Sequence, residues 1–186
     1  RKSNPLWNST KKLIVIYGIA YGMHLLHLHN FFHPNLNTKN ILIDRKSFHP
    51  KLSEIGFYTQ LQNTKNAKSR TSSHINFSRY NLAPEILESK SQTSKSDVYS
   101  FSMIVYEIIT NEIPFQKIVK PELIYSKIVN ESFRPPFNQQ IQYSYQQLIE
   151  KCWLQNPDER PSFSEIIDQL ENDTNFISKD INKEEF

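Results

Sequence analysis

The chain has 186 residues, of which 38% are hydrophobic and 12% aromatic; this suits one globular domain and excludes a long disordered chain. The formal net charge is +3, and no basic stripe accompanies it, so we expect no nucleic-acid partner. No apolar run reaches the roughly 18 residues of a membrane span. The single cysteine, Cys152, excludes an internal disulfide and favours a reducing compartment, which predicts a cytoplasmic protein.

The first predicted element is a long helix at residues 13–29. Its apolar side chains recur on one face, at Ile16, Ile19, Ala20, Met23 and Leu26. Either Ser9 or Thr10 is the expected N-cap. Gly18 and Gly22 lie four residues apart on one side of this helix, and their spacing permits close packing of a neighbour.

The next stretch alternates polar and apolar segments. Residues 33–40 read H-P-N-L-N-T-K-N and precede the apolar run 41–43. This run and residues 51–53 predict a small hairpin with residues 44–50 as its turn, because Asp, Ser and Pro disfavour ladder positions. Residues 57–80 are polar and without period, which predicts a long functional or disordered loop.

The second half of the chain is predicted to be helical. Residues 96–110 form the clearest helix, with Ser96 or Asp97 as its cap and a broad apolar stripe typical of a central, buried helix. The sequence N-E-I-P at 111–114 ends it. Residues from Glu171 onward are polar and are predicted to fray. Three shorter helices are expected, at residues 121–130, 143–153 and 162–170.

Six pieces of the sequence, in order, resemble the C-terminal, larger lobe of a protein kinase. They are the long helix, the loop 33–40, the turn E-I-G at 54–56, A-P-E ending at Glu85, D-V-Y-S-F-S from Asp97, and C-W-L-Q-N-P-D-E-R-P from Cys152. The last piece resembles the tyrosine-kinase-like group, in the style of protist genomes. The resemblance covers about residues 7–172, nearly the whole chain.

The resemblance implies a mainly α fold, a kinase-like C-lobe with a small β-hairpin at the catalytic loop. It divides the chain into a linker or remnant at 1–12, the C-lobe at 13–172 and a polar tail at 173–186. We expect the N-lobe to be absent from this chain, because no Gly-rich loop or V-A-I-K lysine precedes the long helix.

The kinase family reads H-R-D-L-x-x-x-N in its catalytic loop and D-F-G in its metal-binding turn. Asn35 stands at the position of the proton-accepting Asp, Pro34 at that of the Arg, and Glu54 at that of the metal-binding Asp. An amide has no basic oxygen near pH 7, and the longer Glu side chain displaces its carboxylate. The frame itself is kept by His33, Leu36, Asn40 and Gly56.

The resemblance also assigns roles to the remaining site residues. Asn37 replaces the loop Lys of serine/threonine kinases, and Lys39 lies where tyrosine kinases often carry an Arg. Asn40 and Glu54 occupy the family's Mg-ATP and metal positions. The architectural residues are implied to be His33, Gly56, Asp97 and an ion pair of Glu85 with Arg160.

These departures predict a degenerate kinase domain, a pseudokinase that acts through protein–protein contacts at the surface an N-lobe normally covers. No cofactor is expected for this chain, although the family uses Mg-ATP. The alternative is a fragment of an ATP-dependent serine/threonine kinase of the tyrosine-kinase-like group, with its N-lobe encoded upstream. A third reading is a decaying gene product without a selected function.

Overall fold

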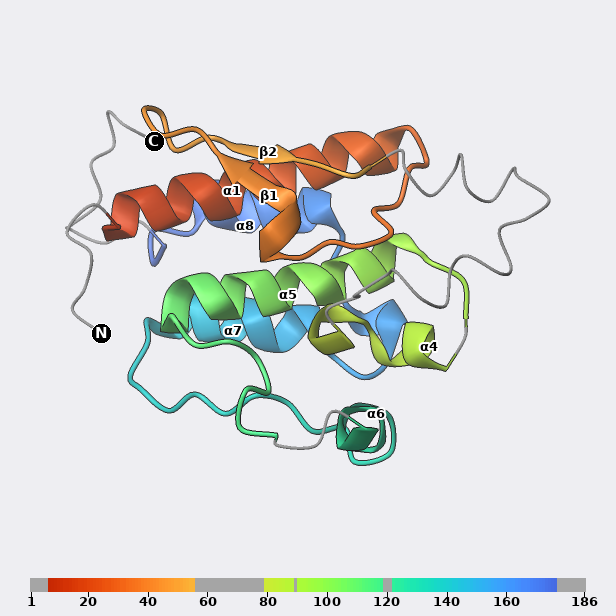
Figure 1. Ribbon diagram of the computed structural model, residues 1–186. Helices are drawn as coiled ribbons and strands as arrows, with labels where there is room; N and C mark the ends of the chain where they lie inside the picture. Colours follow the sequence, from red (N-terminus) through yellow and green to blue (C-terminus); the bar gives the residue numbers. More distant parts are fainter. Residues whose placement is uncertain (1–6, 56–78, 89, 119–121, 177–186) are drawn as a thin grey trace.

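The computed structural model describes residues 7–55, 79–88, 90–118 and 122–176 and is mostly helical, as predicted (Figure 1). Gly56 and most of the predicted loop 57–80 lie outside these residues. In the described part of the chain no helix combines the length and apolarity that crossing a membrane requires. The helices are α1 (Ser9–Leu28), α4 (Pro84–Leu87), α5 (Ser94–Thr110), α6 (Glu122–Val129), α7 (Tyr143–Cys152) and α8 (Phe163–Asn172). Short 3-10 turns cover Thr38–Asn40, Arg79–Asn81 and Pro157–Glu159.

Helix α5 is the centre of the fold. It packs against α7 on one side and α1 on the other, while α8 lies along α1 (Figure 1). The helix begins two residues before the predicted start, and its N-cap is Thr93. Thr93 and Ser96 form a capping box, so the prediction of Ser96 or Asp97 as the cap was wrong. The fully buried apolar side chains of α5 include Val98, Phe101, Met103, Ile104 and Val105.

Helix α1 begins earlier than the sequence pattern predicted. Asn8 caps it, since its Oδ1 accepts the Lys11 N–H at 3.0 Å, whereas Ser9 and Thr10 lie inside the helix. Ser and Thr cap about as well as Asn, so the sequence alone did not separate the three candidates. The predicted apolar face is buried, with Leu26 only partly so: Ile16, Ile19, Ala20 and Met23 have no exposed surface.

A two-stranded antiparallel hairpin lies across α1, with β1 (Ile41–Ile43) paired to β2 (Pro50–Leu52) (Figure 1). Pro50 stands opposite Ile43 in the register, so assigning it to the turn was wrong. Pro is tolerated there because it is the first residue of its strand. A Cβ on Gly18 would lie 2.6 Å from Pro50 Cδ, which explains why α1 carries a glycine under the hairpin.

The C-terminal part of the described chain is packed into the core. Helix α8 begins at the predicted Ser162 cap and continues to Asn172, and Phe176 beyond it is completely buried. The ring of Phe176 meets the edge of Tyr145, with centroids 4.9 Å apart. The prediction that the chain frays from Glu171 onward is therefore wrong as far as Phe176, because one aromatic side chain anchors an otherwise polar segment.

Candidate functional site

The side chain of His33 anchors the loop 33–40 to the protein interior and has no exposed surface. Its ring Nδ1 accepts the Asn35 N–H at 3.2 Å, and its Nε2 lies 3.0 Å from the Ser53 carbonyl oxygen. A backbone N–H only donates and a carbonyl only accepts, so the Nε2 nitrogen carries the proton of a neutral ring. Burial lowers the pKa of His33, which keeps the ring neutral.

Asp97 lies at the N-terminal end of α5, is completely buried and gathers three donors. Its Oδ2 accepts the backbone N–H of His33 at 3.0 Å and contacts Nε2 of His27 at 2.8 Å. Its Oδ1 accepts a hydrogen bond from Gln92 Nε2 at 2.6 Å, and the same nitrogen also donates to the His33 carbonyl. The carboxylate therefore joins the loop, α1 and α5 into one unit.

Sequence reasoning missed His27 and Gln92 as members of this site. His27 lies 70 positions before Asp97, and no local pattern connects the two residues. Gln92 lies five positions before Asp97 in a polar stretch that offered no period. The same reasoning missed Glu107, whose carboxylate accepts the Thr38 hydroxyl at 3.2 Å; burial raises the pKa of Glu107.

The loop is closed by a network of its three asparagines. The side-chain nitrogen of Asn40 donates to the Asn35 carbonyl at 2.8 Å. The side-chain nitrogen of Asn37 donates to the same carbonyl and to Asn35 Oδ1, both at 2.9 Å. Asn37 and Asn40 are buried, and Asn35 is half-buried. The predicted positions 35, 37 and 40 thus meet in one network.

Asn40 and Glu54 are the residues that the sequence assigned to metal and nucleotide. Ser53 connects them: its N–H and its hydroxyl both donate to the Asn40 carbonyl, at 2.9 and 3.0 Å. Within the described residues, the side-chain hydrogen bond of Asn40 is the one that its nitrogen donates to Asn35. Glu54 is exposed and has a φ of 63°, a left-handed conformation that is uncommon for a residue other than glycine.

The remaining predicted site residues lie around this network. Lys39 is exposed, and its backbone N–H is bound by Asn37 Oδ1 at 2.9 Å. Glu85 and Arg160 form a buried ion pair away from the loop, with a shorter N–O distance of 2.7 Å. Among the described residues no three His, Cys, Asp or Glu side chains group closely enough to hold a metal ion.

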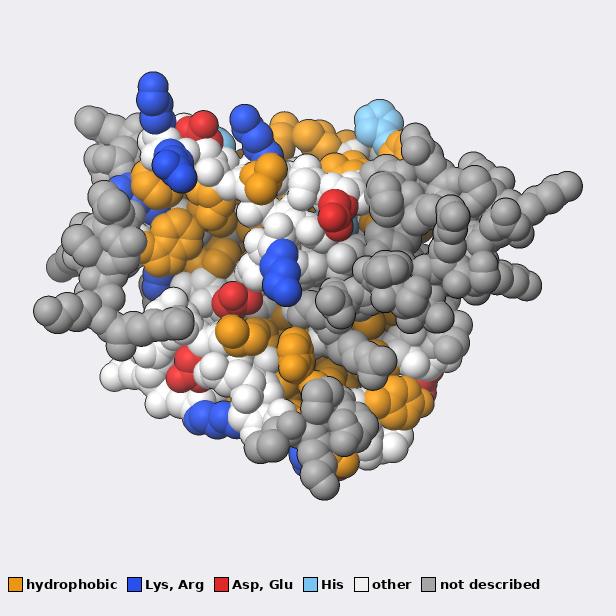
Figure 2. Space-filling model, viewed as in Figure 1, with side chains coloured by type: hydrophobic (Ala, Val, Ile, Leu, Met, Phe, Trp, Pro, Cys, Tyr) orange, Lys and Arg blue, Asp and Glu red, His pale blue; other side chains and the backbone are white. Residues whose placement is uncertain are grey.

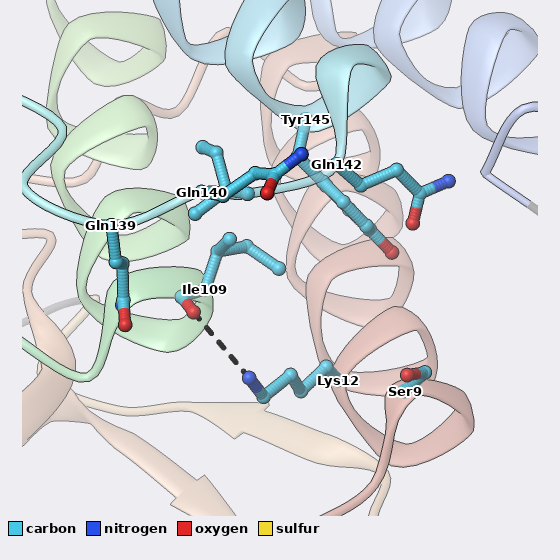
Figure 3. Close-up of a pocket in the computed structure, with 8 residues that line it drawn as sticks. Ser9, Lys12, Ile109, Gln139, Gln140, Gln142 and Tyr145 are labelled. Atoms are coloured by element: carbon cyan, nitrogen blue, oxygen red, sulfur yellow. Dashed lines mark hydrogen bonds between the residues drawn. The ribbon is translucent and has the colours of Figure 1, made fainter.

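A separate cavity of about 210 Å³ opens where α1 begins, α5 ends and α7 begins (Figure 3). Lys12 reaches across it and donates to the Ile109 carbonyl at 3.4 Å. Burial lowers the pKa of Lys12. The rest of the lining contains no carboxylate and consists of Ser9, Gln139, Gln140, Ile141, Gln142 and Tyr145. This cavity shares no residue with the loop 33–40.

The arrangement around the loop is a hydrogen-bond network that fixes the backbone of residues 33–40. A buried, neutral His33 orients the backbone through the Asn35 N–H, and the side chain of Asn35 is a neutral amide. The carboxylates that contact the loop are Asp97, which binds three donors, and Glu107, which accepts the Thr38 hydroxyl, whereas Glu54 is exposed.

Comparison with known proteins shows which family the chain belongs to. Residues 1–170 match the family described as protein tyrosine and serine/threonine kinase. A probable serine/threonine-protein kinase of Dictyostelium discoideum is 33% identical over 177 residues, which cover 92% of this chain and 12% of that relative. The dual specificity protein kinase pyk3 of the same organism is 35% identical over 157 residues, 84% of this chain and 11% of pyk3.

A third relative in that organism, seven transmembrane domain-containing tyrosine-protein kinase 1, is 35% identical over 178 residues, 91% of this chain and 24% of the relative. The chain thus spans between about a tenth and a quarter of the length of these three relatives. The match to the family extends over nearly all described elements, from α1 into α8. The chain belongs to the protein tyrosine and serine/threonine kinase family.

Proposed function

We propose that this chain is a catalytically inactive, degenerate kinase domain, the C-lobe of a pseudokinase that acts through protein–protein contacts. The observation that carries the proposal is the contrast within one loop. The frame of His33, Asp97 and Ser53 is hydrogen-bonded and its His33 and Asp97 side chains are buried, while the group at the family's proton-accepting position is the amide of Asn35. A domain that keeps the hydrogen bonds that shape this loop, but not the carboxylate that accepts a proton, fits a role in binding better than a role in catalysis.

The chemistry of phosphoryl transfer supports the same proposal. The family uses a carboxylate to accept the proton of the substrate hydroxyl and further side chains to hold magnesium with ATP. Asn35 carries no negative charge, and Glu54 places its carboxylate one methylene farther from the backbone than Asp. A displacement of about 1 Å costs on the order of a hundredfold in rate. We therefore assign no cofactor to this chain by itself.

Exposed apolar side chains support a protein partner. Leu42 and Ile43 on β1 are 58% and 40% exposed, next to the loop 33–40. Figure 2 shows hydrophobic side chains at the surface over the upper part of this face, where Figure 1 places the hairpin and α1. Large contiguous apolar patches mark interaction surfaces on soluble proteins. We place this interaction in the reducing cytoplasm, with a protein and not a nucleic acid as the partner.

The test is a phosphoryl-transfer assay of the chain with labelled ATP, magnesium or manganese, and mixed peptide substrates. We expect no transfer above a reaction without protein. The paired variant carries Asn35→Asp and Glu54→Asp, which restores both family carboxylates. Turnover by the unchanged chain that disappears in Asn35→Ala would sink the proposal.

The second candidate is a fragment of an active kinase whose N-lobe is encoded upstream. The observation that favours it is the naming of the relatives as serine/threonine and dual specificity kinases, together with the small share of their length that this chain covers. Measuring the intact mass of the endogenous polypeptide separates the two. A mass larger by an N-lobe, with Mg-ATP-dependent transfer by that longer protein, would favour the fragment.

A further inference from the structure

The orientation of the Asn37 side chain is fixed by two backbone groups. Its Oδ1 accepts the Lys39 N–H at 2.9 Å, and this contact admits only an oxygen, because a backbone N–H always donates. Its Nδ2 lies 2.9 Å from the Asn35 carbonyl oxygen, and this contact admits only a nitrogen, because a carbonyl always accepts. Both contacts assign the same orientation to the amide.

Asn37 in turn fixes the orientation of the Asn35 side chain. The Nδ2 of Asn37 also lies 2.9 Å from Oδ1 of Asn35. The reverse orientation of Asn35 would bring two donor nitrogens together, so its oxygen faces Asn37. The Nδ2 of Asn35 then points away from this network, and no described residue accepts a hydrogen bond from it.

We propose that Asn37 is a positioning residue that holds the amide nitrogen of Asn35 outward, so that the loop presents a hydrogen-bond donor where kinases present a proton acceptor. The inference rests on the proposed function, in which Asn35 occupies that position. It also specifies the ligand chemistry of this position. The outward nitrogen suits an oxygen that carries lone pairs and no proton, such as an oxygen of a phosphoryl group.

A donor nitrogen at position 35, in place of an acceptor oxygen, has a consequence for a substrate hydroxyl. An N–H donor binds one of the two lone pairs of the hydroxyl oxygen and draws electron density from it, which weakens its attack on phosphorus. The hydroxyl proton then finds no acceptor at position 35. The asparagine therefore opposes the reaction through its orientation as well as through its lack of charge.

Substitution of Asn37 separates its two roles. Asn37→Asp keeps an oxygen for the Lys39 N–H and removes both donors to Asn35. We expect Asn35 to turn its amide over, because its nitrogen then gains a carboxylate partner, and its oxygen then faces outward. Asn35→Asp is the converse variant: the new carboxylate accepts from Asn37 Nδ2 without any rearrangement.

The experiment measures hydrogen exchange of the side-chain amide groups by NMR in the unchanged 186-residue chain with labelled asparagine. Asn8 is the matched reference, because it caps α1 through its oxygen and no described residue accepts from its nitrogen. We expect the Asn37 amide to exchange about fivefold more slowly than that of Asn8. The Asn35 amide should exchange as fast as Asn8, and in Asn37→Asp it should become protected by a similar factor.

Asn8→Asp is the control variant and should leave the signals of Asn35 and Asn37 unchanged. Protection of the Asn35 amide in the unchanged chain would overturn the inference, as would an Asn35 signal that Asn37→Asp does not move. The measurement on the unchanged chain stands by itself if Asn37→Asp does not fold. Phosphoryl transfer by the chain would overturn the proposed function, whereas the exchange rates report the orientation of Asn35 in either case.

Discussion

The guanidinium of Arg160 binds the carboxylate of Glu85 through two hydrogen bonds, of 2.7 and 2.9 Å, across 75 positions of the chain. Both side chains are buried, with 1% and 6% of their surface exposed. Arg160 also donates to the backbone carbonyls of Lys95 and Leu154 at 2.9 and 2.8 Å, and its guanidinium stacks on the Tyr99 ring at 5.2 Å. The pair therefore joins α4, α5 and the segment before α8.

Removing one partner of this pair should destabilise the fold strongly. Arg160→Met leaves the Glu85 carboxylate buried without its counter-charge, and we expect the free energy of unfolding to fall by about 3–5 kcal/mol. Urea denaturation measures the loss. Lys127→Met is the control, because Lys127 pairs with Glu131 at the surface and should contribute at most about 0.5 kcal/mol. Equal losses in the two variants would contradict the prediction.

The two glycines of α1 should respond differently to alanine. A Cβ at position 18 would lie 2.6 and 2.7 Å from two ring carbons of Pro50, which sits in a paired strand and cannot easily move. A Cβ at position 22 would lie 3.1 Å from the flexible end of Leu52. Gly18→Ala should therefore lower stability by about 1–3 kcal/mol. Gly22→Ala should be close to neutral, because a gain in helix propensity of about 1 kcal/mol offsets the tighter contact.

Thermal unfolding of the two alanine variants under identical conditions checks this ranking. Both variants replace a glycine of α1 with alanine, so each is the control for the other. A Gly22→Ala variant that is the less stable of the two would show that Leu52, and not Pro50, is the rigid neighbour.

His33 should make stability depend on pH. Burial lowers its pKa from 6.5, so the unfolded chain binds a proton at a pH where the native ring stays neutral. The contribution of His33 is complete above about pH 6.5 and is lost as the pH falls toward the lowered native value. We expect the melting temperature to fall less between pH 7.5 and 5.5 in His33→Gln, which has no titrating group, than in the unchanged chain.

The same melting measurements on His29→Gln provide the control, because His29 is exposed at the end of α1. That variant should follow the unchanged chain. Parallel curves for His33→Gln and the unchanged chain would instead assign the pH dependence to other groups.

Phe176 should be essential for stability although it lies in a polar segment. Its side chain is completely buried against Tyr145, and the carbonyl of the neighbouring Asn175 accepts the Ser144 hydroxyl at 3.1 Å. Phe176→Ala should cost about 3–5 kcal/mol, the range for a buried aromatic side chain. Phe31→Ala removes a ring that is 51% exposed and should cost much less. Urea denaturation of both variants distinguishes a core position from a frayed end.

Local sequence patterns predicted much of the fold. The helices α1 and α5 and the two strands were foreseen because apolar spacing and turn residues act within a few positions of the chain. The boundaries were less well predicted. Asn8 and Thr93 became caps in place of neighbouring polar residues, because several residues of similar capping strength stand side by side.

The sequence by itself determined the kinase-like order of motifs and the amide of Asn35 in the loop 33–40. Only the tertiary structure decided how these residues meet. The contact of His27 with Asp97 spans 70 positions, and the burial of Phe176 against Tyr145 joins the segment after α8 to α7. The physical reason is the distance along the sequence over which each interaction acts. Capping and periodicity involve residues a few positions apart, whereas these contacts exist only after α1, α5, α7 and α8 have packed together.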